Sequence, residues 1–212
     1  MPLAFSHFLK TILLDLSELF VARKLADSKT VTIAACKRHA EMCSMVIKTV
    51  MNDFIPESAL LKEKASEAWN MLTSLILGIT DDLLWRDGQN YLADDLSEPL
   101  LLSCFTCLLK SNIYSEALWK KVTECFRLWC HRVKSVLVWG SVIVPMTQEV
   151  AAVLNSENAE KTLKLTIGLH APIIVDIDNE FLVFSWSKLS SKTEILLGTF
   201  AIILLRITAK AA

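Results

Sequence analysis

The stretch from Ala68 to Trp139 constrains the fold more than any other part of the chain, because its apolar residues recur every three or four positions. Such spacing places apolar side chains on one face of a helix. Five tryptophans lie along the stretch: Trp69, Trp85, Trp119, Trp129 and Trp139. The pattern predicts consecutive amphipathic helices that pack against one another, with the indoles in the core.

The first of these helices, expected from Ser66 to Leu84, is apolar over most of its circumference. Its apolar residues are Trp69, Leu72, Leu75, Ile76, Leu77, Ile79, Leu83 and Leu84. A helix that is apolar nearly all round has to be covered on at least two sides. We therefore place it inside a stack of helices.

Helical spacing continues on both sides of this helix. We expect further helices over residues 3–24, 32–54, 92–110, 115–129, 133–154 and 179–189, joined by short polar links, with Ser115 as an N-cap and a kink at Pro145. Residues 161–169 are expected to form a short helix, and Ile173 to Val175 to be extended. The fold class is therefore all-α: a HEAT/armadillo-like helical stack, a segment of an α-solenoid, over residues 1–190. A closed helical bundle is the alternative.

Composition favours a cytoplasmic protein. Hydrophobic residues make up 53% of the chain, yet no uninterrupted apolar run reaches the length of about 18 residues that a membrane span needs. The net charge is −1 with scattered Lys and Arg, so nucleic acid is not an expected partner. No signal-peptide pattern opens the chain, and we read the six cysteines as reduced. Residues 191–212 form an unassigned apolar tail, expected to reflect truncation or a gene-model artefact.

Cysteines provide one candidate metal site. Cys104 and Cys107 have the spacing of half a zinc site, which Cys125, Cys130 and His131 would have to complete. The first pair lies within a predicted helix and the second half lacks a tight cysteine pair. We therefore expect the cysteines to pack in the core.

Clustered carboxylates provide a second candidate. Asp94, Asp95 and Glu98 have the spacing with which all-helical prenyl-diphosphate enzymes hold magnesium, and Asp81 and Asp82 add another acidic pair. Such a site also needs basic residues opposite the carboxylates, and the sequence does not locate them. Acidic residues at the start of a helix are ordinary partners of the helix dipole.

The remaining candidates are single residues or pairs. His39 precedes Cys43 by one helical turn, although an exposed helix histidine is the expected reading. Asp176 and Asp178 are expected in a solvated turn. No phosphate loop, dinucleotide fingerprint or nucleophile elbow occurs in the sequence. We therefore predict no catalytic, cofactor-binding or metal-binding residue, and no cofactor.

The positions of several packing residues resemble the N-terminal helical region of the Ral GTPase-activating protein subunits, which are relatives of tuberin. The resemblance runs from Cys36 to Leu189 and is carried by Trp69 to Leu84, Leu92, Ala93, Leu96, Pro99, Leu100, Leu118, Trp119, Trp139, Thr147, Asp178 to Glu180, Trp186 and Leu189. In that family the catalytic asparagine lies in a separate C-terminal α/β domain, which nothing in this chain resembles.

The resemblance implies a helical scaffold and dimerisation segment of a cytoplasmic complex that stimulates GTP hydrolysis by a small Ral-like or Rheb-like GTPase. Its expected partner is a companion GTPase-activating subunit, and it would meet the GTPase only through the full-length protein. The chain itself is not expected to be an enzyme. The alternatives are a magnesium-dependent helical prenyl-diphosphate enzyme and a HEAT-like adaptor unrelated to GTPases.

Overall fold

The computed structural model describes residues 2–21, 29–51, 65–85, 91–156, 161–168, 170 and 172–190. The end of the helix predicted over residues 32–54 and the apolar tail 191–212 lie outside these residues. The chain divides into two compact units, residues 1–111 and residues 112–212, and each is described by itself.

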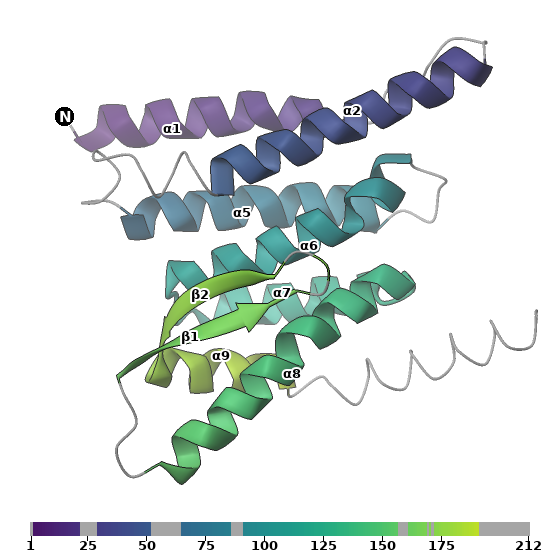
Figure 1. The fold of residues 1–212 in the computed structure, drawn as a ribbon. Helices are drawn as coiled ribbons and strands as arrows, with labels where there is room; N and C mark the ends of the chain where they lie inside the picture. The colour runs from purple at the N-terminus through teal and green to yellow at the C-terminus, as the bar shows by residue number, and fades with distance from the viewer. Residues whose placement is uncertain are drawn as a thin grey trace, which may run out of the picture. The chain divides into compact units, whose positions relative to one another are not determined.

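The first unit is built from helices that run side by side (Figure 1). They are α1 (Pro2–Ser17), the short 3-10 helix η1 (Glu18–Phe20), α2 (Lys29–Thr49), α5 (Ala65–Leu84) and α6 (Tyr91–Ser111). α1 packs on α5, α2 packs on α6, and α5 packs on α6. Two successive helix pairs stacked in this way are typical of HEAT-like repeats. The predicted helical fold class is confirmed here, and the solenoid stays a prediction.

The middle of this unit is the α5–α6 pair, and both helices carry buried polar residues. Thr73 and Thr80 of α5 and Thr106 of α6 are at most 1% exposed. Each hydroxyl donates to the carbonyl four residues earlier, at 2.6 to 2.8 Å. A buried hydroxyl with its own helix as acceptor avoids the free-energy cost of an unpaired polar group. These hydrogen bonds explain how threonine is accommodated in helices that are buried on most sides, as was predicted for residues 66–84.

The second unit combines three helices with a two-stranded sheet. It contains α7 (Glu116–Trp129), α8 (Val133–Asn155), β1 (Thr162–Ile167), β2 (Ile173–Asp178) and α9 (Asn179–Ser190). The strands are antiparallel, with Thr162 opposite Asp178 and Ile167 opposite Ile173. α9 packs on α8, α7 and β2, and β1 packs on α8. The sheet is thus held against helices on one of its faces.

The short helix expected over residues 161–169 is wrong, because this segment forms β1. Leu165 and Ile167 are buried, as are Val175 and Ile177 of β2, while the residues between them are exposed or half-buried. This period of two is typical of a strand with one face covered. The extended conformation expected for Ile173 to Val175 is confirmed.

Pro145 lies inside α8, and the helix continues through it to Asn155. Proline has no amide hydrogen, so the carbonyl four residues earlier, that of Ser141, has no partner within the helix. The amide of Gly168, at the end of β1, donates to this carbonyl at 3.4 Å. Gly168 has a φ of 103°, a conformation that favours glycine. The proline in α8 therefore provides an attachment point for the end of the strand.

α8 also has the length and apolar composition of a membrane-spanning helix, by these two criteria alone and among the described residues. Core helices of water-soluble proteins share the same properties. Its Trp139, Val142 and Met146 are buried, and the helix packs on α9 and β1. Its apolar character thus serves, at least on this face, the packing of the second unit.

Candidate functional site

The cysteines predicted to lie in the core are buried in five of six cases: Cys43, Cys104, Cys107, Cys125 and Cys130, while Cys36 is half-buried. Burial raises the pKa of the Cys107 thiol well above its usual value of 9.0, and the neighbouring Cys104 raises it further. Neutral buried thiols are neither good nucleophiles nor metal ligands. Among the described residues, no group of three or more His, Cys, Asp or Glu side chains is placed to hold a metal ion.

The clustered carboxylates lie on two helices of the first unit. Asp94 and Asp95 are exposed at the start of α6, with Glu98 half-buried one turn later, and Asp81 and Asp82 lie in the last turn of α5. Asp94 is placed in the first turn of its helix, where a carboxylate stabilises the positive end of the dipole. Asp176 and Asp178 lie in β2 rather than in the predicted turn, and Asp178 Oδ1 accepts the Glu180 amide at the start of α9 (2.8 Å).

His39 and Cys43 meet at a single backbone oxygen. His39 Nε2 lies 2.5 Å and Cys43 Sγ 3.2 Å from the carbonyl oxygen of Leu19 in η1. The hydroxyl of Tyr91 lies 2.8 Å from His39 Nδ1. A carbonyl only accepts, so Nε2 carries the hydrogen in the bond to Leu19. The expected exposed histidine is wrong, because His39 is half-buried and ties η1, α2 and α6 together.

Four of the five tryptophans between Ala68 and Trp139 are buried, as predicted. Trp69, Trp119, Trp129 and Trp139 are at most 8% exposed, whereas Trp85 is 59% exposed directly after α5. The prediction is therefore wrong for Trp85. The sixth tryptophan, Trp186, is half-buried on α9. The indoles are mainly packing groups.

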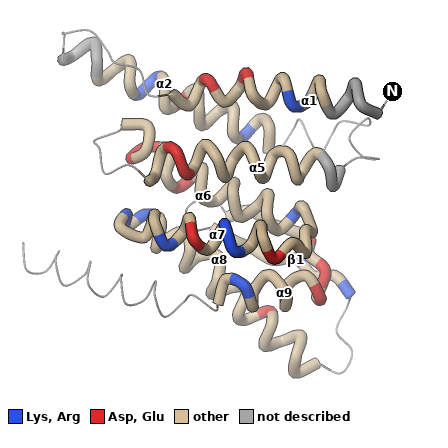
Figure 2. The backbone as a smooth tube through the Cα atoms, turned by 180° about the vertical axis from the view of Figure 1, so that it is seen from behind, with Lys and Arg blue, Asp and Glu red and all other residues tan. Residues whose placement is uncertain are grey.

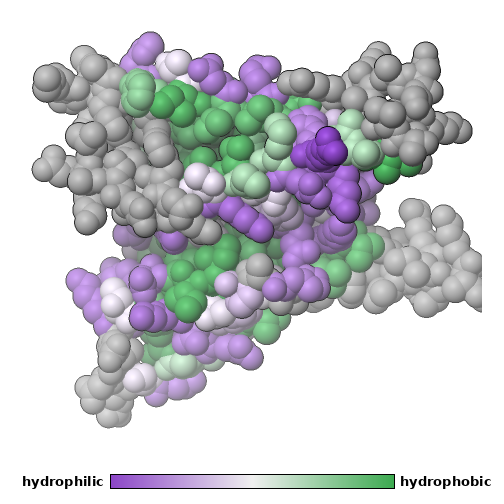
Figure 3. Space-filling model, turned by 45° about the horizontal axis from the view of Figure 1, so that its top comes forward, coloured by the Kyte–Doolittle hydropathy of each residue, from purple (hydrophilic) through white to green (hydrophobic). Residues whose placement is uncertain are grey.

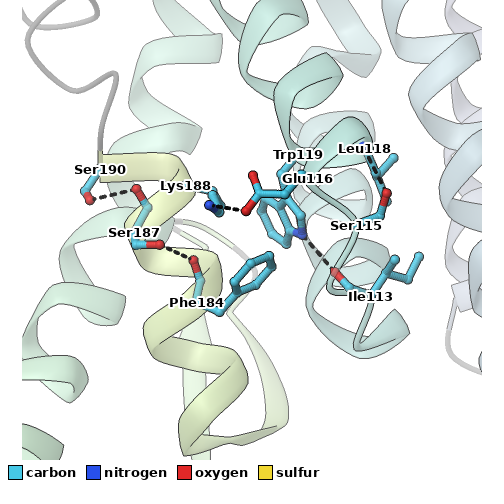
Figure 4. Close-up of polar contacts among 9 residues, drawn as sticks. All are labelled: Ile113, Ser115, Glu116, Leu118, Trp119, Phe184, Ser187, Lys188 and Ser190. Atoms are coloured by element: carbon cyan, nitrogen blue, oxygen red, sulfur yellow. Dashed lines mark hydrogen bonds and ion pairs between the residues drawn. The ribbon is translucent and has the colours of Figure 1, made fainter.

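The most extensive aromatic cluster of the second unit lies between α7 and α9 (Figure 4). The Trp119 indole nitrogen donates to the Ile113 carbonyl at 2.9 Å. Its ring meets the rings of Phe181 and Phe184 edge to face, with centroids 6.2 Å apart in both cases. Tyr114 packs on the same two phenylalanines, at 5.1 and 4.9 Å. Edge-to-face pairs at these distances stabilise a packed core.

Polar contacts hold the start of α7 beside this cluster. Ser115 is the N-cap that the sequence predicts, since its hydroxyl accepts the Leu118 amide at 3.4 Å. Lys188 Nζ lies 2.5 Å from Glu116 Oε1 and 5.1 Å above the centroid of the Phe184 ring (Figure 4). With Glu116 well exposed, this ion pair stabilises the contact only slightly. The cluster is a packing arrangement with Tyr114 at its exposed edge.

A groove lies between α1, η1 and α5 in the first unit, with a volume of about 780 Å³. Its walls are mainly apolar, with Lys10, Glu18 and Asp82 at the margins. The apolar surface of the N-terminal helices is visible in green in Figure 3. The sequence could not reveal this groove, because it exists only once α1, early in the chain, lies beside α5.

Residues of both charge signs are spread over the helices (Figure 2). The part of the chain that the structure describes therefore carries no broad basic face of the kind that nucleic-acid binding requires. Of the described features, the groove is the hollow best suited to hold a partner.

Comparison with known proteins gives a family and a distant relative. A family model described as the RALGAPB N-terminal domain matches residues 35–157, from α2 to the end of α8. A Rap-GAP domain-containing protein of Dictyostelium discoideum is 26% identical over 125 residues, which are 58% of this chain and 8% of that protein. The chain thus corresponds to a small part of this relative. No solved structure matches it.

Proposed function

The chain belongs to the family of RALGAPB N-terminal domains, and from this we propose that it is a non-catalytic helical scaffold region of a GTPase-activating protein. The GTPase it serves is of the small Ral-like or Rheb-like class. The observation that carries the proposal is the family match over 35–157, which spans most of α2 and all of α5, α6, α7 and α8.

The matched positions support a packing role. Leu72, Trp119 and Trp139 carry the resemblance, and all three are buried. Five of the six cysteines are buried, whereas Asp94 and Asp95 are exposed on the surface of α6. We place GTPase stimulation in another domain of the complete protein, as the resemblance implies.

The partner in this proposal is a companion GTPase-activating subunit in the cytoplasm. Free cysteines, which all six are in this structure, suit a reducing compartment. Exposed apolar side chains are available in both units, among them Leu14 on α1, Trp85 directly after α5 and Val144 on α8. Contiguous exposed apolar residues often mark protein interfaces.

Two measurements test the proposal. The purified chain, mixed with GTP-loaded Ral or Rheb, is expected to leave GTP hydrolysis at its intrinsic rate, while a complete GTPase-activating complex in the same assay accelerates it. The tagged chain is expected to co-purify with a co-expressed companion subunit. Acceleration by the chain alone would contradict the non-catalytic assignment, and failure to retain the companion would contradict the scaffold role.

A further inference from the structure

We propose that the groove between α1 and α5 is the docking site for an amphipathic helix of about three turns from a protein partner. A bulky apolar side chain of that helix inserts at Gly78, its acidic end lies by Lys10 and its basic end by Glu18. The inference rests on the proposed scaffold function and names the surface through which the scaffold binds.

Two matching stripes of side chains line the groove. One is on α1 and the residues after it, and the other is on α5; both have the spacing i, i+4, i+7, i+11, which within an α-helix keeps residues on one face. In the first stripe the last residue follows the end of η1 in an extended conformation. The α1 stripe is Lys10, Leu14, Ser17 and Val21, and the α5 stripe is Met71, Leu75, Gly78 and Asp82. All eight residues are exposed or half-buried, so the two stripes form an uncovered surface rather than a core.

The third position of each stripe is small, Ser17 on one helix and Gly78 on the other. α1 and α5 lie side by side and run in the same direction (Figure 1), and both small residues line the groove. On each helix a leucine precedes the small residue by three positions, exposed Leu14 before Ser17 and half-buried Leu75 before Gly78. A hole between larger residues is what a single large apolar side chain needs, as in the knobs-into-holes packing of helices.

Gly78 has no packing reason to be glycine. A Cβ built at this position meets no atom within 4 Å, and its residue lies well inside α5. Glycine in a helix interior costs about 1 kcal/mol relative to alanine. Gly78 thus destabilises its own helix and leaves empty space in the groove. An incoming side chain can occupy this space.

Length and charge favour a helix as the occupant. From Met71 to Asp82 the α5 stripe spans about 17 Å, or roughly three helical turns. Lys10 lies within α1, and Glu18 lies eight residues later in η1; Asp82 lies in the last turn of α5, which runs in the same direction as α1 (Figure 1). An acyl chain carries a charge at one end only, whereas a helix with glutamates in its first turn and arginines in its last complements both ends. That charge order also stabilises the incoming helix through its own dipole.

The direct test uses a fluorescein-labelled 16-residue peptide with leucines at i, i+4, i+7 and i+11, glutamates in the first turn and arginines in the last. Binding to the full 212-residue chain is measured by fluorescence anisotropy. We expect saturable binding that Gly78→Phe weakens at least tenfold, because the ring fills the hole. Gly140→Phe in α8 is the matched control, since a Cβ at Gly140 also meets nothing within 4 Å, and it is expected to leave binding unchanged.

A charge exchange tests the orientation of the helix. Lys10→Glu should weaken binding of this peptide several-fold, and a peptide with lysines in its first turn should recover the lost affinity on that variant. Circular dichroism melts establish that each variant remains folded. A scrambled peptide of the same composition, which has no continuous apolar face, is expected not to bind.

Other results overturn the inference. The first is equal peptide binding by the wild type and Gly78→Phe. The second is Gly78-dependent uptake of lauric acid without peptide binding. The third is a wild-type dimer that Gly78→Phe dissociates, because the occupant of the groove would then be a second copy of the chain. Failure of the inference is separable from failure of the scaffold function. If Gly78→Phe and Gly140→Phe retain the companion subunit equally, only the proposed docking site is wrong. If the wild-type chain retains no companion subunit, the scaffold function is wrong.

Discussion

The indole nitrogen of Trp186 donates a hydrogen bond to the hydroxyl of Thr147 at 2.9 Å, which joins α9 to α8. The Thr147 hydroxyl in turn lies 2.7 Å from the carbonyl oxygen of Ile143, which accepts its hydrogen. Both side chains are among the positions that carry the family resemblance, and they lie 39 residues apart in the sequence. Their contact gives these two positions a shared physical role, which is to hold the last described helix in place.

A double-mutant cycle on this pair should measure its strength. Trp186→Phe removes the donor and keeps a ring, and Thr147→Val removes the acceptor and keeps the shape. Each single variant is expected to lose about 1 kcal/mol in the free energy of unfolding, as a typical hydrogen bond contributes. The double variant should lose less than the sum, measured by urea denaturation. Full additivity would show that the bond contributes nothing to stability.

Trp119 and Trp85 form a matched comparison of a buried and an exposed indole, at 1% and 59% exposure. Trp119→Phe leaves a void and deprives the Ile113 carbonyl of its donor. Its cost is expected to be about 1 to 3 kcal/mol in unfolding free energy. Trp85→Phe is expected to change that quantity by less than about 0.5 kcal/mol. A similar loss in both variants, measured by chemical denaturation, would contradict the core role of Trp119.

The sequence predicted the helices well because each has its own apolar period, and the N-cap Ser115 because its signal is local. It missed β1, where alternation of Leu163, Leu165 and Ile167 was read as a helix. It also missed the shared Leu19 contact of His39 and Cys43, because the partners come from separate elements. The groove between α1 and α5 could not be predicted for the same reason. Local periodicity sets the elements, whereas sites made by two distant elements depend on how the elements pack.

The cysteines should differ strongly in their reaction with iodoacetamide, because the thiolate is the reacting form. Half-buried Cys36 is expected to react first in the native chain at pH 7.5. Cys107 should react only after denaturation, since burial and then Cys104 raise its pKa well above the usual value. Peptide mass mapping measures each site, and Cys36→Ser should remove the fast reaction. Native labelling of Cys107 at the rate of Cys36 would contradict its burial.

The raised pKa of the Cys107 thiol also sets a direction for stability against pH. The folded state retains the thiol proton at a pH where the unfolded state, with a thiol pKa near the usual 9.0, has begun to lose it. The unfolded state is therefore favoured as the pH rises through this value. Cys107→Ala should reduce this loss of stability between pH 8 and pH 10, measured as the slope of unfolding free energy against pH. Cys36→Ala is the control for removal of a thiol that is not fully buried.

Pro145 should be required for the tight attachment of β1 to α8. Pro145→Ala restores an amide that donates to the Ser141 carbonyl within the helix, and this amide then competes with the Gly168 amide for the same oxygen. α8 is expected to gain stability, while the Gly168 amide exchanges with solvent several-fold faster, as measured by NMR hydrogen exchange. Pro99→Ala in α6 is the matched control: it restores an amide in another helix and should leave Gly168 exchange unchanged. If the Gly168 amide exchanges equally slowly in the wild type and in Pro145→Ala, the hydrogen bond to the Ser141 carbonyl does not hold the end of β1. The packing of β1 on α8 would then position the strand without it.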